Sequence, residues 1–120
     1  MFKLCVISIY VSDIELAKEF YCEKLGFTIS EQYDEATIGL VNDGVAIVLC
    51  KTECESTASY SQEAQVVLGF ETDNLLNKMQ ELSAKGIKML FDTPQPCPPG
   101  HYNAFLDPFG NAFELLEFSK

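Results

Sequence analysis

Apolar residues recur along the chain in short runs whose spacing alternates between strand-like and helix-like. The β-branched run Leu4–Val11 predicts a strand, and Ser12 or Asp13 is placed to cap the helix that follows. In this helix, predicted to run to about Leu25, apolar residues fall three or four positions apart on one face. Gly26 stands where a left-handed helix end is expected, so the first segment predicts a strand followed by an amphipathic helix.

Three strand-like runs follow this helix. They are predicted at Phe27–Gln32, Thr37–Val41 and Val45–Cys50. The tripeptide Asn42-Asp43-Gly44 is typical of a hairpin turn, so the second and third runs form an antiparallel pair. The segment Lys51–Glu63 is polar and rich in Ser and Thr, which predicts a connecting loop.

The same order of elements then returns. Gln65–Thr72 predicts a strand, and Asp73 or Asn74 is placed to cap a second helix. The apolar face of this helix is predicted to contain Leu75, Leu76, Met79 and Leu82. Gly86 is placed to end the helix, and the strand Ile87–Phe91 is predicted to follow.

The last part of the chain is predicted to hold a loop and a hairpin. Four of the eight residues in Thr93–Gly100 are proline, which excludes a helix or a central strand and favours a loop. Asp107-Pro108-Phe109-Gly110 suits a tight turn between the strands Tyr102–Leu106 and Asn111–Phe118.

The chain therefore contains two copies of one βαβββ unit. We predict an α+β fold of two tandem βαβββ modules, whose curved mixed sheets form a cleft with the helices outside. Residues 1–120 form one domain, with modules at about 1–57 and 63–120. Matching the two helix caps sets Val6 opposite Val67, and matching the hairpin glycines sets Val48 opposite Glu114.

The net charge limits the classes of ligand that this domain is expected to bind. The 120 residues carry 18 acidic side chains against 8 basic ones, a net charge of −10, and every basic residue is lysine. The acid excess argues against nucleic-acid binding, and the absence of arginine removes the best clamp for carboxylates and phosphates. The charge thus favours cationic or neutral ligands, although solubility alone also accounts for it.

The cysteines and the N-terminal residues indicate the cellular compartment in which the protein is expected. Five cysteines at scattered spacings are an odd number without a CxxC pair, which predicts a reduced cytoplasmic protein. The apolar start of the chain is too short to span a membrane and lacks the pattern of a secretory leader.

Two segments, VSDIELAKEFYCEKLGF (Val11–Phe27) and DPFGNAFEL (Asp107–Leu115), resemble the vicinal oxygen chelate superfamily. This group contains glyoxalase I, bleomycin-resistance proteins, fosfomycin-modifying enzymes and extradiol dioxygenases. The resemblance covers essentially the whole chain. It implies the fold, but not one reaction, because the same scaffold serves isomerases, lyases, transferases, dioxygenases and drug-binding proteins.

The resemblance also implies where a divalent metal would be held. The four family positions correspond here to Val6, Val48, Val67 and Glu114, and only the last has a ligating side chain. A catalytic metal needs three or more protein ligands, so the standard metal mechanism is excluded and no cofactor is predicted. A rebuilt metal site is the alternative, using Glu114 with the residues Glu71, Cys50 and His101. A pair formed by Cys50 and Cys54 is a further, weaker possibility for metal binding.

Strand alternation adds further residues to the predicted cleft. The complete set is Val6, Ser8, Tyr10, Val48, Cys50, Val67, Glu71, His101, Phe105 and Glu114. Glu114 is the candidate base or partner for a ligand amine, with a solvent-facing glutamate as the alternative. His101 is either a group at the cleft mouth or an exposed loop residue. The aromatic residues either stack on a planar or cationic ligand or pack in the core.

These observations lead to a hypothesis and two alternatives. The hypothesis is a metal-free, small-molecule-binding protein, similar to the bleomycin-resistance branch, that sequesters a cationic or neutral aromatic compound. The first alternative is a metal-dependent lyase, isomerase or dioxygenase with a non-standard site. The second is a structural subunit whose cleft is filled by its own side chains. A homodimer is expected, swapped or unswapped, without nucleic-acid or membrane partners.

Overall fold

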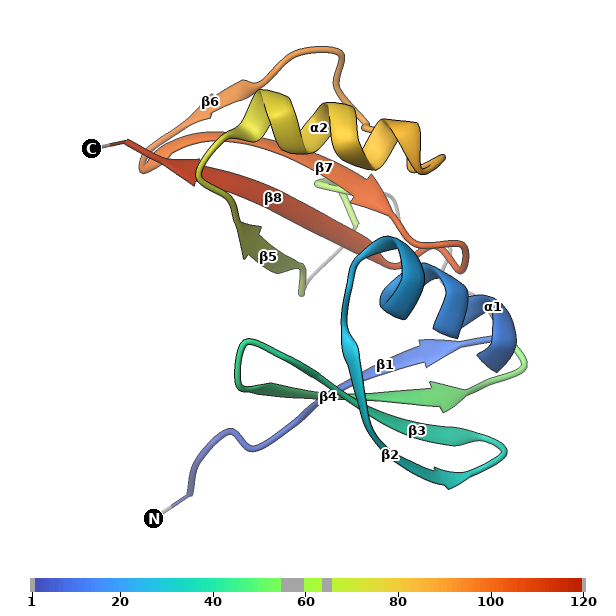
Figure 1. Ribbon diagram of the computed structural model, residues 1–120. Helices are drawn as coiled ribbons and strands as arrows, with labels where there is room; N and C mark the ends of the chain where they lie inside the picture. Colours follow the sequence, from blue (N-terminus) through green and yellow to red (C-terminus); the bar gives the residue numbers. More distant parts are fainter. Residues whose placement is uncertain (1, 55–59, 64–65, 120) are drawn as a thin grey trace. The chain divides into compact units, whose positions relative to one another are not determined.

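The computed structural model of the protein describes residues 2–54, 60–63 and 66–119 (Figure 1). The chain divides into two compact units, residues 1–56 and 57–120, each of which contains one four-stranded sheet. No helix in the described ranges is long and apolar enough to cross a membrane.

The first unit has a β-α-β-β-β order. Its strands are β1 (Ile7–Val11), β2 (Thr28–Asp34), β3 (Thr37–Asn42) and β4 (Val45–Lys51). The strands lie in the order β1-β4-β3-β2, with β1 parallel to β4 and the other pairs antiparallel. The hairpin between β3 and β4 turns through Asp43 and Gly44, both at positive φ, as the predicted turn requires.

The helical segment of this unit changes its geometry partway. The α-helix α1 (Ile14–Lys18) is capped by Asp13, whose carboxylate accepts a hydrogen bond from the Leu16 N–H at 3.0 Å. It continues as the π-helix η1 (Glu19–Lys24), which pattern analysis does not distinguish from an α-helix. The wider turn buries the adjacent side chains of Phe20 and Tyr21 together.

The second unit repeats this order. Its elements are β5 (Leu68–Glu71), α2 (Leu75–Ala84), β6 (Gln95–Cys97), β7 (Gly100–Leu106) and β8 (Ala112–Phe118). The sheet order β5-β8-β7-β6 matches that of the first unit strand for strand, with β5 parallel to β8. Two mixed sheets, each with a helix, confirm the predicted α+β repeat.

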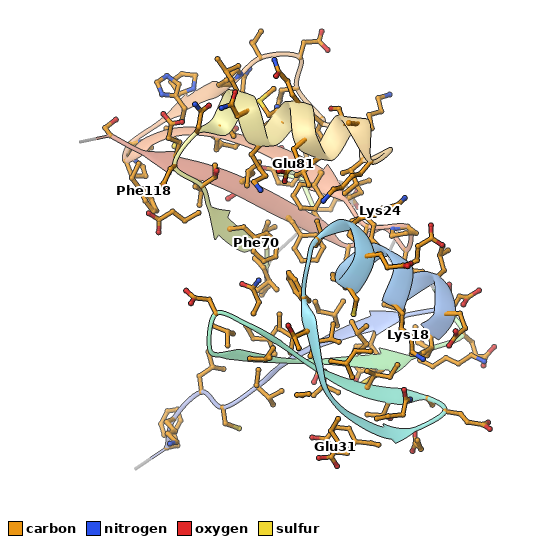
Figure 2. All side chains as sticks on the ribbon, viewed as in Figure 1. Lys18, Lys24, Glu31, Phe70, Glu81 and Phe118 are labelled. Atoms are coloured by element: carbon orange, nitrogen blue, oxygen red, sulfur yellow. The ribbon has the colours of Figure 1, made fainter. Side chains whose placement is uncertain are left out.

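An aromatic cluster forms the core of the second unit. The rings of Phe105 and Phe113 stack with their centroids 5.5 Å apart. The ring centroid of Phe70 on β5, a residue labelled in Figure 2, lies 5.5 Å from that of Phe113. The apolar face of α2 is buried through Leu75 and Met79. The cluster and the helix therefore share one side of this sheet.

The tight turn before β8 is held by one buried carboxylate. Asp107 Oδ1 accepts hydrogen bonds from the backbone N–H groups of Phe109 and Asn111, at 2.9 and 2.8 Å. Its Oδ2 accepts a third bond, from the Asn111 side-chain amide at 2.7 Å. The predicted turn is confirmed, and it sets where β8 begins.

Two sequence predictions on the edge of this sheet are wrong. Ile87–Phe91 is not a strand: it makes only an isolated bridge, between Met89 and Phe105. The edge strand is instead β6, inside the segment Thr93–Gly100 that was predicted to be a loop. Pro96 is tolerated there because an edge strand can leave one N–H position unpaired.

The side chain of Asn103 explains why the segment around Phe91 stays irregular. Its Oδ1 accepts from the Phe91 N–H at 3.1 Å, and its Nδ2 donates to the Phe91 carbonyl at 2.9 Å. A fully buried amide thus takes the place of a backbone partner. Backbone pairing of the segment with β7 is therefore limited to the Met89–Phe105 bridge and the hydrogen bond from the Leu90 N–H to the Ala104 carbonyl at 2.8 Å.

We expect Asn103→Ala to lower the free energy of unfolding by about 2 kcal/mol, because it leaves the half-buried backbone N–H and carbonyl of Phe91 unpaired. Urea unfolding followed by circular dichroism measures this loss. Asn77→Ala, at an exposed position of α2, is the matched control and should change stability by less than about 0.5 kcal/mol. Equal effects of the two substitutions would contradict the role of Asn103.

Candidate functional site

The sheet of the second unit has one face toward α2 and one face away from it. Asn103 lies on the helix side, because its Nδ2 contacts the sulfur of Met79 on α2 at 3.5 Å. Asn103 pairs with Leu115, so alternation along β8 directs Glu114 to the opposite side. We call this opposite side, which carries Gly69, Glu114 and Ala104, the open face of the second unit.

Glu114 stands in a row of very small residues on this face. Gly69 of β5 pairs with it on one side and Ala104 of β7 on the other. A Cβ atom placed on Gly69 would lie 2.9 Å from Cδ1 of Leu116, the flexible end of a neighbouring side chain. Glu114 is therefore the only side chain longer than a methyl group in the row Gly69–Glu114–Ala104.

A residue from outside the sheet reaches this carboxylate. The hydroxyl of Tyr60, which lies in the turn at residues 60–63, donates a hydrogen bond to Oε2 of Glu114. Fifty-four positions separate the two residues in the sequence. Both side chains are half-buried, so the contact lies at the surface of the open face and not inside the core.

This environment raises the pKa of the Tyr60 phenol above its ordinary value near 10. Burial contributes most, because it disfavours the charged phenolate. The hydrogen bond to Glu114 and the negative charge of Glu114 act in the same direction, and Tyr102 adds a smaller effect. Tyr60 is consequently a neutral hydrogen-bond donor throughout the physiological pH range.

The next row of the open face is larger and mixed in character. Glu71 of β5, Leu116 of β8 and Tyr102 of β7 lie side by side across the three strands. Phe91 packs edge-on against the Tyr102 ring, with centroids 5.8 Å apart. Together with Tyr60, the open face thus carries two carboxylates, Glu114 and Glu71, and two phenol rings, those of Tyr60 and Tyr102.

The first unit has a corresponding open face without a carboxylate in the matching row. Ser8, Val48 and Gly39 lie side by side there, in the positions that Gly69, Glu114 and Ala104 occupy in the second unit. The register therefore agrees with the sequence alignment that set Val48 opposite Glu114.

The row beyond it contains Tyr10, Cys50 and Thr37. The side chain of Tyr10 is 59% exposed, whereas the apolar residues of the other face, Ile47 and Leu49, are buried. Ser8, Tyr10, Val48 and Cys50 therefore share one face of this sheet.

The residues at the family's metal positions do not fit a metal ion. Val6 and Val67 each directly precede the first strand of their unit, and valine offers no lone pair. Val48 is equally unable to ligate, and Oε2 of Glu114 already accepts the Tyr60 hydrogen bond. Within residues 2–54, 60–63 and 66–119, no three His, Cys, Asp or Glu side chains are grouped in a way that could hold a metal.

Two predicted cleft residues lie on the other side of their sheet. Phe105 is 1% exposed and stacks on Phe113 in the core, so it does not reach the open face. His101 pairs with Glu117, whose Oε1 accepts from the Leu75 N–H at the start of α2, at 2.7 Å. Alternation along β7 separates both residues from Glu114, because odd-numbered positions of this strand face α2.

His101 instead borders a hollow of about 390 Å³ beside the N-terminus of α2. Its other lining residues are Asp73, Asn74, Leu75, Leu76, Pro94 and Glu117. The rebuilt metal site that combined His101 with Glu114 and Glu71 is therefore not formed within this unit.

Sequence reasoning missed Tyr60, since the segment Lys51–Glu63 was interpreted only as a polar connection. One signal was present: Tyr60 is the single aromatic residue in that polar segment. An isolated aromatic residue in a polar connection is a candidate to pack back onto the domain.

Comparisons with known proteins agree with this geometry. Residues 3–115 match the family described as the Glyoxalase/Bleomycin resistance protein/Dioxygenase superfamily. Because this match covers nearly all of the chain, the protein belongs to that superfamily, which confirms the resemblance seen in its motifs. A comparison with curated proteins gives no match.

Several solved structures share the fold over almost the whole chain. A superfamily member from Sphaerobacter thermophilus DSM 20745 is 24% identical with a TM-score of 0.74, covering 98% of both chains. A glyoxalase/bleomycin resistance protein/dioxygenase from Nocardioides has 19% identity and a TM-score of 0.77, covering 100% of this chain and 85% of its own. TnmS3, an antibiotic binding protein from Streptomyces sp. CB03234, has 25% identity and a TM-score of 0.72, covering 99% of this chain and 98% of its own.

The raised pKa of Tyr60 predicts a pH dependence of stability. Above about pH 10 the unfolded chain ionises this tyrosine while the folded protein keeps it neutral, so rising pH favours unfolding. The free energy of unfolding of the wild type should therefore fall more steeply above about pH 10 than that of Tyr60→Phe. Below that pH the group contributes no slope in either protein.

Urea unfolding at a series of alkaline pH values measures the two slopes. Tyr33→Phe, which removes an exposed tyrosine of β2, should retain the wild-type slope. Parallel curves for the wild type and Tyr60→Phe would contradict the assignment.

Proposed function

We propose that this protein binds a small organic molecule, cationic or neutral and aromatic, without a metal centre. The observation that carries the proposal is the donor set at the family's metal positions: three valines and one glutamate that already accepts a phenol. Such a set suits recognition of an organic ligand better than Lewis-acid chemistry.

The proposed contacts lie on the open faces of the two sheets. Candidates are the predicted residues Val6, Ser8, Tyr10, Val48, Cys50, Val67, Glu71 and Glu114, together with Tyr60 and Tyr102. Glu114 would pair with a cationic group, and the phenol rings would stack on a planar or cationic one. If the protein catalyses a reaction, Glu114 is the candidate base.

Charge and similarity support this choice of ligand. A net charge of −10 without any arginine disfavours anionic ligands over the whole surface. The similar structure TnmS3 is described as an antibiotic binding protein. All five cysteines have free thiols, which is compatible with the proposed location in the reducing cytoplasm.

Glu114→Gln is expected to weaken binding of a cationic glycopeptide antibiotic by about tenfold or more, because it removes a charge-assisted contact. Binding of neutral aromatic compounds should change little. Isothermal titration calorimetry with both ligand types measures the difference. Glu81→Gln on α2 alters the net charge equally at an exposed helix position and is the matched control (Figure 2).

Absence of saturable binding across a broad panel of cationic and neutral aromatic compounds would refute the proposed function. A stoichiometric divalent ion in protein purified without chelator would instead favour the alternative, a metal-dependent lyase, isomerase or dioxygenase. Metal analysis of the same preparation separates the two.

We further propose that the protein is a homodimer, since the outer edges of both sheets are open to pairing with a second copy. In the described residues, β1 and β5 each pair on one side only. Light scattering at micromolar concentration is expected to give twice the monomer mass of 13.4 kDa. A stable monomer under these conditions would contradict the dimer.

A further inference from the structure

The carboxylate of Glu114 is already engaged within the chain. It is the only long side chain in its row, and the hydroxyl of Tyr60 donates to its Oε2. Ala104, its neighbour in the row, is fully buried although it lies on the face away from α2. Gly69, on the other side of Glu114, is exposed, so the row is only partly covered. Tyr60 is the one hydrogen-bond donor to Glu114 found in the described chain.

A ligand that binds through Glu114 meets this phenol as a competitor. A phenol bound to a carboxylate is a charge-assisted hydrogen bond, which is stronger than a bond between neutral groups. Exchanging it for a neutral ligand hydroxyl replaces one O–H donor by another and brings little net gain. An ammonium group adds the attraction of opposite charges and can displace the phenol.

We propose that Tyr60 is an intramolecular competitor at the Glu114 site, which ligands with an ammonium group displace and neutral alcohols do not. This inference rests on the proposed function, since it concerns the same carboxylate. It adds a threshold: a ligand must bind Glu114 more strongly than the chain's own phenol does. Tyr102, which also influences Tyr60, and Glu71 are the other polar groups on this part of the face.

The threshold can be tested with two ligands of matched size. Benzylamine is a cation at neutral pH and benzyl alcohol is its neutral counterpart. Wild-type protein should bind benzylamine and show no measurable affinity for benzyl alcohol. Tyr60→Phe removes the competing hydroxyl and keeps the ring, so it should bind benzylamine about tenfold more tightly and begin to bind benzyl alcohol.

Three further proteins complete the binding experiment, which ligand-observed NMR and calorimetry can follow. Tyr33→Phe should behave as the wild type, because Tyr33 lies exposed on β2. Glu114→Gln should lose benzylamine binding, and the double variant Tyr60→Phe/Glu114→Gln should not recover it. Recovery in the double variant would show that Tyr60 acts on a group other than Glu114 and would overturn the proposal.

A measurement without ligand tests the contact itself. Phenolate absorbance during alkaline titration should show one tyrosine that ionises at lower pH in Glu114→Gln than in the wild type, and Tyr60→Phe should lack this transition. Identical titrations of the wild type and Glu114→Gln would overturn the proposal at its first step.

The outcomes separate this inference from the proposed function. Equal benzylamine affinities of the wild type and Tyr60→Phe would overturn the proposal that Tyr60 competes for Glu114, while leaving the proposed small-molecule binding intact. No benzylamine binding by either protein would overturn ammonium recognition at Glu114. Failure of the whole antibiotic and aromatic panel would refute the proposed function itself.

Discussion

Each unit depends on the parallel pairing of its first strand with its last one. Parallel neighbours cannot be joined by a tight turn, so the chain leaves β1 or β5 through a capped helix and returns through antiparallel strands. The pairing places Ser8 beside Val48 and Gly69 beside Glu114. A slip of one residue along β8 would direct Glu114 into the aromatic cluster and expose Phe113. The candidate site is thus a consequence of register, which burial of the apolar face enforces.

Much of this arrangement could be predicted from the sequence because it follows from local patterns. The helix cap at Asp13, the hairpin at Asp43-Gly44 and the alternation that turns Glu114 away from the core all depend on nearby residues. The edge of the second sheet could not be predicted, because there a buried side chain, Asn103, satisfies backbone groups that a strand would otherwise pair. A pattern of hydrophobic positions does not show where a side chain, in place of a neighbouring strand, pairs with backbone groups.

The candidate site, too, follows only in part from local sequence patterns. The strand residues of the open faces follow from alternation, whereas Phe105 and His101 lie on the side of β7 opposite to Glu114. Tyr60 lies outside regular structure and meets Glu114 across 54 positions, so only the folded chain reveals the contact. Its effect on recognition follows from simple electrostatics: a carboxylate with a resident donor discriminates among incoming donors by their charge.

The smallness of the residues beside Glu114 has an evolutionary consequence. Gly69 and Ala104 place no side-chain atom beyond a methyl group on either side of Glu114, and the strands that carry them, β5 and β7, both pair with β8. Adding a methyl at position 69 would press only on the flexible tip of Leu116. The surroundings of the carboxylate can therefore change through small substitutions at position 69 while the sheet stays as it is. A lineage could shift from one ligand shape to another through single substitutions, without remodelling a loop or paying the folding cost that a new connection entails.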